Sequence, residues 1–368
     1  MRILVVSTSI RVPGTHGGST HVSELVAALR AHAPTMLVAR AGSKGPDVVG
    51  VGVLKRTAPA GLRHGTAALH AGLALARARA FAPDVIYERG ASYGAGAMLS
   101  AVLKVPMITM VLDEHVSPIS LARASRLIAT DLGVVPARYR HKAVRVSWGA
   151  NVERFRPDVD GSAVRARHGL DGAFVVGYSG TFRAWHGLPT LVDAAARLGG
   201  RKVRFFLVGE GPERAALERS IAAAGLGDRF VFAGRVPYEA MPEHMAAMDV
   251  VAAPFDPDRH DLSRTRGFTL DPLKVFESVA MARPTFTIDA ANIRALFGDD
   301  GVHLRYAPAR DGEALARLIA WAQDEPAAAQ AMAERGALKV AREHTWAAHG
   351  AHLVQIFEEL LAEQREGR

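Results

Sequence analysis

The 368-residue sequence contains no cysteine, so no disulfide, zinc–thiolate site, iron–sulfur cluster or cysteine nucleophile can carry its chemistry. It also lacks a long apolar segment. The most apolar stretch, residues 93–112, is interrupted by Lys104 and Pro106 and falls short of the roughly 20 apolar residues that cross a bilayer. The opening MRILVVSTS has neither the apolar length nor the cleavage site of a secretory signal. We therefore expect a cytoplasmic protein without a membrane-spanning segment.

Acidic residues are scarce in the first half of the chain. Residues 1–170 hold 22 Lys and Arg against 10 Asp and Glu, whereas the whole chain holds 45 against 37. A basic half suits an anionic acceptor, or peripheral association with the anionic inner face of a membrane; solvated arginines on helix faces are the alternative. The densest basic cluster, residues 138–145, comes without a recognisable reading helix, so no nucleic-acid partner is expected.

Apolar runs of strand length alternate with segments of helical periodicity, which indicates an α/β protein with parallel sheets. The first run is followed by a glycine-rich loop and by a helix that Ser19 or Thr20 can cap. The pattern restarts after Pro157. The expected strands are 2–7, 35–39, 85–87, 106–112, 126–129, 143–146, 174–179, 203–208, 230–232, 250–253 and 285–288; the expected helices of the second half are 188–198, 213–224, 238–245 and 273–281.

The restart predicts two Rossmann-like parallel-sheet domains, residues 1–157 and residues 158–345. The final segment, residues 346–368, follows a plausible cap at Thr345 and has apolar residues at helical spacing. We expect this helix to pack back on the first domain. Because ligands of open parallel sheets bind beyond the carboxyl ends of the strands, two facing domains would define a cleft that holds the functional site.

The loop from Gly14 to Gly18 precedes the first helix. Glycines at such a place let backbone amides approach a phosphate at the helix N-terminus, although a tight turn alone also favours glycine. The dinucleotide fingerprint G-x-G-x-x-G is missing, and the second strand ends at Arg40 instead of an acidic ribose ligand. These two absences argue against a dehydrogenase.

A second glycine-containing loop follows the strand at 174–179. It carries Arg183 and His186 where cations could meet phosphate oxygens, and arginine is the better anion ligand of the two. Trp185 could be only a packing aromatic, with Arg183 solvated. Two glycines, an arginine and the Trp-His-Gly sequence in one loop favour phosphate binding.

A third segment, residues 271–281, begins a helix after Pro272. The amides of Leu273 and Lys274 in its first turn could bind an anion. Glu277 lies about one turn further along, where its carboxylate could accept hydrogen bonds from two ribose hydroxyls while the helix start holds a diphosphate. The alternative is an amphipathic helix with a solvent-exposed glutamate.

Taken in order along the chain, these segments resemble the retaining GT-B glycosyltransferases of family 4. The resemblance covers nearly the whole chain. The segments that carry it are the Gly17-Gly18 loop, PDVIYERG (83–90), MVLDEH (110–115), VSWGANVERFRP (146–157), VGYSGTFRAWHG (176–187), FFLVGEGPER (205–214), VFAGRVPYEAMPEHMAAMDVVAAPF (231–255) and DPLKVFESVAMARP (271–284).

The resemblance implies a role for each matching residue. Gly17 and Gly18 match the glycine pair near the donor diphosphate, and His115 matches the polar residue near the transferred sugar. Arg183 and His186 occupy the loop that meets the phosphates. Val236 matches the residue whose backbone meets the nucleotide base, and Glu277 matches the second glutamate of the E-x7-E pattern, which binds ribose. Arg183, Lys274 and main-chain amides would then stabilise the leaving diphosphate, and His115 would contact the sugar.

Two positions depart from the family pattern. Thr269 occupies the first glutamate position of E-x7-E and cannot offer a charged acceptor to the donor sugar. His186 stands where the family usually has lysine, which lowers the charge near the phosphates unless His186 is protonated or Arg183 and Lys274 compensate.

The resemblance implies an enzyme that transfers a hexosyl group from a nucleoside-diphosphate sugar, expected to be a UDP-sugar, to a hydroxyl of a glycan, a lipid-linked or a small-molecule acceptor. Asp256 and Asp258 superficially match a metal-binding D-x-D pair, but we interpret residues 256–266 as a mobile polar loop and expect no metal or other cofactor. Two alternatives stay open: a nucleotide-sugar epimerase or hydrolase on the same scaffold, and a non-catalytic sugar-nucleotide-binding protein.

Overall fold

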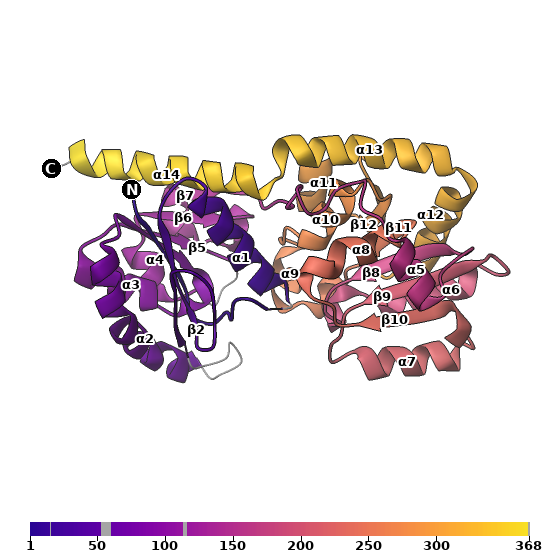
Figure 1. Cartoon of the computed structure of the whole chain (residues 1–368), viewed down its shortest axis with the longest axis horizontal. Helices are drawn as coiled ribbons and strands as arrows, with labels where there is room; N and C mark the ends of the chain where they lie inside the picture. Colours follow the sequence, from indigo (N-terminus) through magenta and orange to yellow (C-terminus); the bar gives the residue numbers. More distant parts are fainter. Residues whose placement is uncertain (15, 53–59, 113–115, 367–368) are drawn as a thin grey trace. The chain divides into compact units, whose positions relative to one another are not determined.

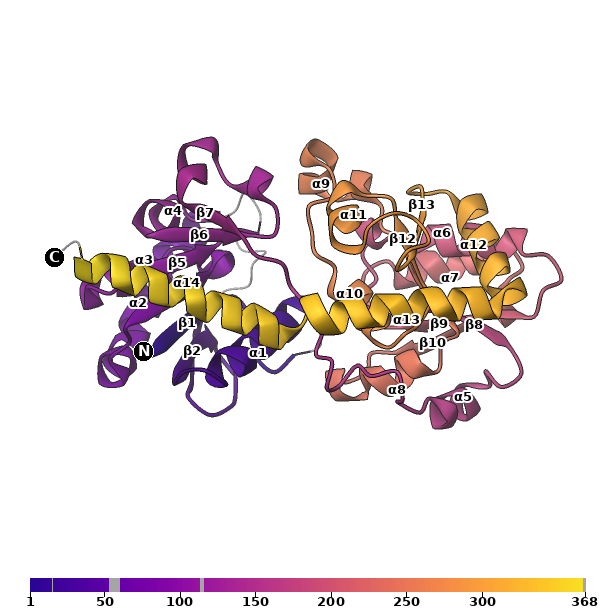
Figure 2. The same cartoon turned by 90° about the horizontal axis from the view of Figure 1, so that it is seen from above.

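The computed structural model describes residues 1–14, 16–52, 60–112 and 116–366. Its contacts divide the chain into two compact units, one formed by Met1–Trp148 with Trp346–Arg368 and the other by Gly149–Thr345 (Figures 1 and 2). The first boundary lies before the expected one at residue 157. The reason is that Ala150 forms a parallel bridge with Thr345 and the ring of Phe155 packs against Tyr238, both in the second unit.

The described part of the first unit contains a parallel seven-stranded sheet in the order β3-β2-β1-β4-β5-β6-β7. Its central strands are fully buried, as their continuous apolar sequences predict. The strands are β1 (Ile3–Ser7), β2 (Thr35–Arg40), β3 (Val48–Gly52), β4 (Val85–Arg89), β5 (Met107–Met110), β6 (Arg126–Ala129) and β7 (Ala143–Arg145).

The helices described in this unit are α1 (Gly17–Arg30), α2 (Ala60–Phe81), α3 (Ala95–Leu103), α4 (Pro118–Arg123) and α14 (Trp346–Glu366). The C-terminal helix α14 lies beside α1 (Figures 1 and 2). The two helices approach closely because Gly350 has no side chain; a Cβ there would lie 2.7 Å from the Cβ of Ala28. No helix in the described ranges is both long and apolar enough to span a membrane.

Glu88, near the end of β4, is a fully buried carboxyl group. Its Oε1 accepts a hydrogen bond from the amide of Gly96 in α3 at 2.9 Å. Burial raises the pKa of Glu88 to about 7, although the neighbouring polar groups of Ser120, Gly96, Gly94 and Thr109 oppose the shift. The folded protein therefore holds a proton on Glu88 at a pH where the unfolded chain has lost it.

This proton makes the stability of the first unit depend on pH. Because the folded pKa lies above the ordinary value of 4.5, the free energy of unfolding should fall by about 3 kcal/mol as the pH rises from 4.5 to 7 and then level off. Urea unfolding of Glu88→Gln at pH 5 and pH 7.5 should lack this loss. An equal loss in the variant would mean that Glu88 is not the titrating group.

The described part of the second unit contains a parallel six-stranded sheet in the order β10-β9-β8-β11-β12-β13. The strands are β8 (Phe174–Ser179), β9 (Val203–Val208), β10 (Phe230–Gly234), β11 (Val250–Ala253), β12 (Thr285–Ile288) and β13 (Arg305–Ala307). The helices are α5 (Ser162–His168), α6 (Pro189–Arg197), α7 (Arg214–Ala223), α8 (Met241–Ala246), α9 (Asp261–Arg266), α10 (Leu273–Ala280), α11 (Ala291–Phe297), α12 (Gly312–Asp324) and α13 (Pro326–Glu343).

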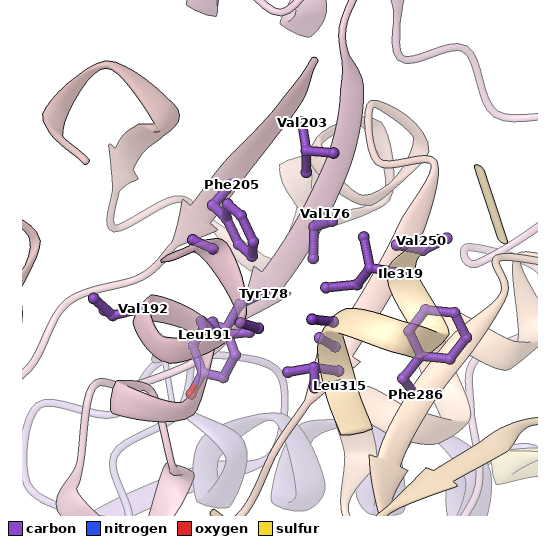
Figure 3. Packing of buried hydrophobic residues seen from close by; sticks show 14 of the residues in the cluster. Val176, Tyr178, Leu191, Val192, Val203, Phe205, Val250, Phe286, Leu315 and Ile319 are labelled. Carbon is purple, nitrogen blue, oxygen red and sulfur yellow. The ribbon is translucent and has the colours of Figure 1, made fainter. Parts of the chain in front are cut away.

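A hydrophobic core joins one face of this sheet to α6 and α12. Val176 and Tyr178 of β8 lie among buried side chains from β9, α6 and α12 (Figure 3). The core fixes the carboxyl end of β8, and with it the loop that leads into α6.

The expected α/β architecture is confirmed, and so are the limits of five strands, β6, β8, β9, β11 and β12. Two strands were not expected: β3 and β13, which lie at the edges of their sheets. A third difference concerns residues 256–266, interpreted from the sequence as a loop. They form a 3-10 turn (Pro257–Arg259) and α9, whose start is capped by the His260 side chain accepting from the Ser263 amide.

Candidate active site

The loop after β8 is fixed to neighbouring strands by its backbone. The Gly180 amide donates to Val208 O at 2.9 Å, and the Phe182 amide donates to Glu210 O at 3.0 Å. Gly187, with φ +68°, ends the 3-10 turn Ala184–His186, and a Cβ there would collide with the carbonyl oxygen of Pro254. The loop is therefore held at the carboxyl ends of β8, β9 and β11, with Arg183 exposed.

Lys274, in the first turn of α10, meets this loop. Its Nζ donates to Tyr178 Oη at 2.8 Å and lies 4.1 Å from the centre of the Tyr178 ring. The amine also lies 5.3 Å from the Phe255 ring centre. Gly180 leaves room for it, since a Cβ at Gly180 would stand 2.7 Å from Nζ. Burial lowers the pKa of Lys274 to about 7, and the Glu277 carboxylate acts in the opposite direction.

His186 is buried in the same loop. Its Nδ1 lies 2.8 Å from Tyr178 Oη and also contacts the carbonyl oxygen of Thr181. Burial foremost, and then the nearby Lys274, lower the pKa of His186 to about 2, so the ring is neutral. Of the two possibilities that the sequence left open, this position favours a neutral His186, with Arg183 and Lys274 left to supply the positive charge near the phosphates.

Trp185, in the same loop, packs against aromatic side chains of the segment after β11. Its ring stacks on Phe255 at 5.9 Å between centroids and lies 4.9 Å from the ring of His260. Its carbonyl oxygen accepts a hydrogen bond from the Asp256 amide at 2.9 Å. Trp185 thus links the loop after β8 to the segment after β11.

Glu277 is buried one turn into α10 and accepts a hydrogen bond from Tyr238 Oη at 3.2 Å. The Tyr238 ring lies 5.6 Å from the Phe155 ring, with the Arg154 guanidinium 5.4 Å from its centre. The alternative of a solvent-exposed glutamate is wrong, because the face of α10 that carries Glu277 is turned inward. Leu273 begins the same helix and is half-buried.

Two other positions in this unit complete the predicted set. Val236 is half-buried just after β10, the strand that pairs with β9. Thr269 is buried in the segment before α10, two residues from the buried Asp271. The base contact of Val236 and the sugar contact of the Thr269 position stay predictions.

Asp256 and Asp258 are engaged with arginines. The Asp256 carboxylate lies 3.7 Å from Arg259 and 3.9 Å from Arg310, while Asp258 pairs with Arg310 at 2.5 Å. Asp256 also accepts the Asp258 amide, as a turn cap. The described residues contain no group of three or more His, Asp and Glu side chains arranged to hold a metal ion.

In the first unit, Gly17 and Gly18 open α1, which starts before the expected caps. His16 caps the helix instead, its Nδ1 accepting from the Ser19 amide at 3.1 Å. Ser19 Oγ donates to the Arg11 carbonyl oxygen, so it is used inside the loop. His115 lies outside the described residues, and its sugar contact, like the phosphate contact of Gly17 and Gly18, stays a prediction.

Sequence reasoning did not single out Tyr178, Tyr238 or Phe255. Tyr178 and Phe255 end or follow apolar strands and carry only the signal of core residues. Tyr238 follows a proline in a polar stretch. Their contacts distinguish them: Tyr178 and Phe255 lie against Lys274, and Tyr238 donates to Glu277. That information depends on how the strands and α10 assemble.

The second unit places the half-buried Lys274, the start of α10, the exposed Arg183 and the buried Glu277 around the carboxyl end of β8. Amines and helix N-termini attract anions, and a carboxylate binds hydroxyl groups. The arrangement therefore suits a ligand that combines phosphate with a polyol.

Comparison with known proteins agrees with this chemistry. Residues 173–324 match the family model described as glycosyl transferases group 1. The alpha-D-kanosaminyltransferase of Streptomyces kanamyceticus is 30% identical over 202 residues, which cover 54% of this chain and 48% of that protein. The chain therefore matches about half the length of this relative.

Two solved structures resemble the chain over nearly its whole length. Sucrose-phosphate synthase from Thermosynechococcus elongatus has a TM-score of 0.79 at 19% identity, covering 98% of this chain and 99% of that one. HepE from Anabaena, solved with UDP and glucose, has a TM-score of 0.75 at 18% identity, covering 98% and 100%. The chain as a whole therefore has the GT-B fold, and residues 173–324 are similar to the group 1 glycosyl transferases.

Proposed function

We propose that the protein is a retaining glycosyltransferase of family 4, which moves a hexosyl group from a nucleoside-diphosphate sugar to an acceptor hydroxyl. The observation that carries the proposal is the meeting of Lys274, the loop after β8 and Glu277 at one site. The group 1 family match includes all three. A UDP-sugar is the expected donor, and the Anabaena HepE structure was solved with UDP and glucose.

In the proposed reaction, negative charge grows on the leaving diphosphate as the glycosidic bond breaks. Lys274, Arg183 and the first amides of α10 stabilise that charge more strongly than the charge of the bound donor. Glu277 accepts hydrogen bonds from the ribose hydroxyls and so fixes the nucleotide relative to the helix start. Retention follows from the resemblance to family 4, and the anomer of the first product, read by NMR, tests it.

The donor is identified by a thermal-shift and calorimetry panel of UDP, GDP, ADP and TDP sugars, followed by turnover with hydroxyl acceptors. Glu277→Gln should weaken binding of the selected nucleotide about tenfold or more, since an amide replaces a carboxylate that accepts two hydroxyls. Glu313→Gln, at an exposed position of α12, is the matched control and should bind normally. Equal binding by both variants would remove Glu277 from the donor site.

The acceptor is a glycan, a lipid-linked or a small-molecule hydroxyl compound. The first screen therefore includes hydroxyl compounds of all three classes. Formation of free sugar or an epimer without any acceptor would instead favour the hydrolase or epimerase alternative. Binding without turnover across the whole panel would favour a non-catalytic sugar-nucleotide-binding protein.

The transfer is proposed to need no metal ion. The carboxylates of the Asp256–Asp258 pair already have arginine partners, so a cation would have to displace Arg259 and Arg310. Turnover in the presence of EDTA should equal turnover with added Mg²⁺. A loss of turnover that Mg²⁺ restores would overturn this part of the proposal.

We also propose that the first unit associates peripherally with an anionic membrane. The helices α2, α3 and α4 contain no acidic residue in their sequences. They pack side by side in that order and expose five large apolar side chains, Leu62, Leu69, Leu73, Val102 and Ile119. Cationic and apolar groups together suit the surface of an anionic bilayer.

Vesicle flotation tests this association. The protein should float with vesicles that contain phosphatidylglycerol at low salt, and less at high salt, because the attraction is screened. Leu69→Glu/Leu73→Glu should stay in the soluble fraction, whereas Leu338→Glu, at an exposed position of α13, should float like the unmodified protein. Failure of the unmodified protein to float at low salt would contradict the proposal.

A further inference from the structure

Tyr178 occupies a position in the site that the proposed function leaves unused. Its ring is buried in the core of the second unit (Figure 3). Its hydroxyl oxygen lies 2.8 Å from Lys274 Nζ, 2.8 Å from His186 Nδ1 and 2.9 Å from the Thr181 carbonyl oxygen. The Tyr178 hydroxyl on β8 therefore contacts both the loop after β8 and the first turn of α10.

The donors and acceptors fix the direction of these bonds. An ammonium group can only donate, so the Tyr178 oxygen accepts from Lys274 and has its own proton left to donate. The Thr181 carbonyl can only accept, and it lies within reach of both Tyr178 and His186. A neutral His186 with its proton on Nδ1 therefore satisfies the network, with Thr181 O accepting from both side chains.

The ring of Tyr178 contributes as well. The amine stands over it at 4.1 Å from the centroid, a cation–π geometry, with Phe255 at 5.3 Å. The charged or titratable groups around the amine are Tyr178 from β8, His186 from the loop and Glu277 from α10; Arg183 and His260 act on His186. Tyr178 is the neighbour that gives the amine both a hydrogen-bond acceptor and an aromatic face.

We propose that Tyr178 is a positioning residue, which holds the Lys274 amine beneath Gly180 in its charged form and so sets the pH range in which the site accepts a diphosphate. The part of this inference that concerns the diphosphate rests on the proposed function. The part that concerns the amine does not, because it follows from the contacts of Tyr178 alone.

The pKa of Lys274, about 7, gives the sign of the expected pH dependence. The amine is charged below this pH and neutral above it, so affinity for a diphosphate falls as the pH rises through 7. A bound diphosphate stabilises the charged amine, so binding above pH 7 takes up a proton. Removing the Tyr178 hydroxyl takes a hydrogen bond from the charged form and lowers the pKa of Lys274 further.

The amine itself can be followed by NMR. The sequence has seven lysines, so their side chains, labelled with ¹³C at Cε, give few signals, and Lys274→Arg identifies the signal of Lys274. In Tyr178→Phe the titration midpoint of Lys274 should fall by about one pH unit. Tyr306→Phe is the matched control: its hydroxyl donates to the Gly298 carbonyl oxygen, and its loss should leave the midpoint unchanged. An unchanged midpoint in Tyr178→Phe overturns the inference.

UDP affinity provides the second readout. For Tyr178→Phe it should be about fivefold weaker at pH 7 but nearly equal to that of the unmodified protein at pH 5.5, where both amines are mostly charged. A loss that is the same at both pH values would indicate a merely structural role and overturn the inference. If the unmodified protein binds no nucleoside diphosphate at all, the proposed function fails, while the NMR titration still decides the role of Tyr178.

Discussion

Replacing Lys274 by methionine should lower kcat/KM for sugar transfer by about 10²–10³-fold, the loss that follows removal of one preorganised donor to a developing anion. The protein should stay folded. Methionine keeps the unbranched form of the side chain, one atom shorter than lysine, and places an apolar group near Tyr178 and Phe255, where desolvation lowers the pKa of the amine. The thermal midpoint should therefore stay the same or rise.

The matched control is Lys202→Met, which removes an exposed lysine of the same unit and should alter neither kcat/KM nor the thermal midpoint by more than a small amount. Both variants are assayed with the donor that the binding panel selects. A Lys274→Met enzyme within twofold of the unmodified protein would mean that the leaving diphosphate is stabilised elsewhere, with Arg183 as the next residue to test.

The substitution Gly187→Ala should cost about 3 kcal/mol or more of stability and abolish nucleotide binding. Gly187 has φ +68°, a conformation that costs an alanine roughly 1–2 kcal/mol, and its added Cβ would overlap the carbonyl oxygen of Pro254. The nearest atoms belong to the backbone of Pro254 and Phe255, so no flexible side chain can move aside. Relieving this overlap requires the loop after β8 to move away from the end of β11. That movement displaces His186 and the part of the loop that lies against Lys274.

Gly172→Ala separates the two contributions. Gly172 has the same φ of +68°, but a Cβ there would have no atom within 4 Å. This variant should lose only the conformational cost of about 1–2 kcal/mol and should bind nucleotide normally. Thermal unfolding and UDP calorimetry of the pair measure the difference, and similar losses in both variants would show that the contact with Pro254 is unimportant.

The strands show how far sequence patterns reach. Five of them, including Phe174–Ser179 and Val203–Val208, have the expected limits, because a strand buried on both faces must be apolar throughout. The strands that were not expected, Val48–Gly52 and Arg305–Ala307, lie at sheet edges. Edge strands are half-covered, so glycine and arginine are tolerated there and the pattern disappears.

The candidate site shows the same division. Composition and the order of motifs were enough to expect an α/β chain of two sheets with Arg183, Lys274 and Glu277 at loops and helix starts beyond the strands, since these features depend on residues near one another in the sequence. The charge of His186, the partner of Glu277 and the contacts of Tyr178 depend on the tertiary structure. Burial and contacts between residues such as Tyr178 and Lys274, which are 96 positions apart, set pKa values and hydrogen bonds, and no local pattern records them.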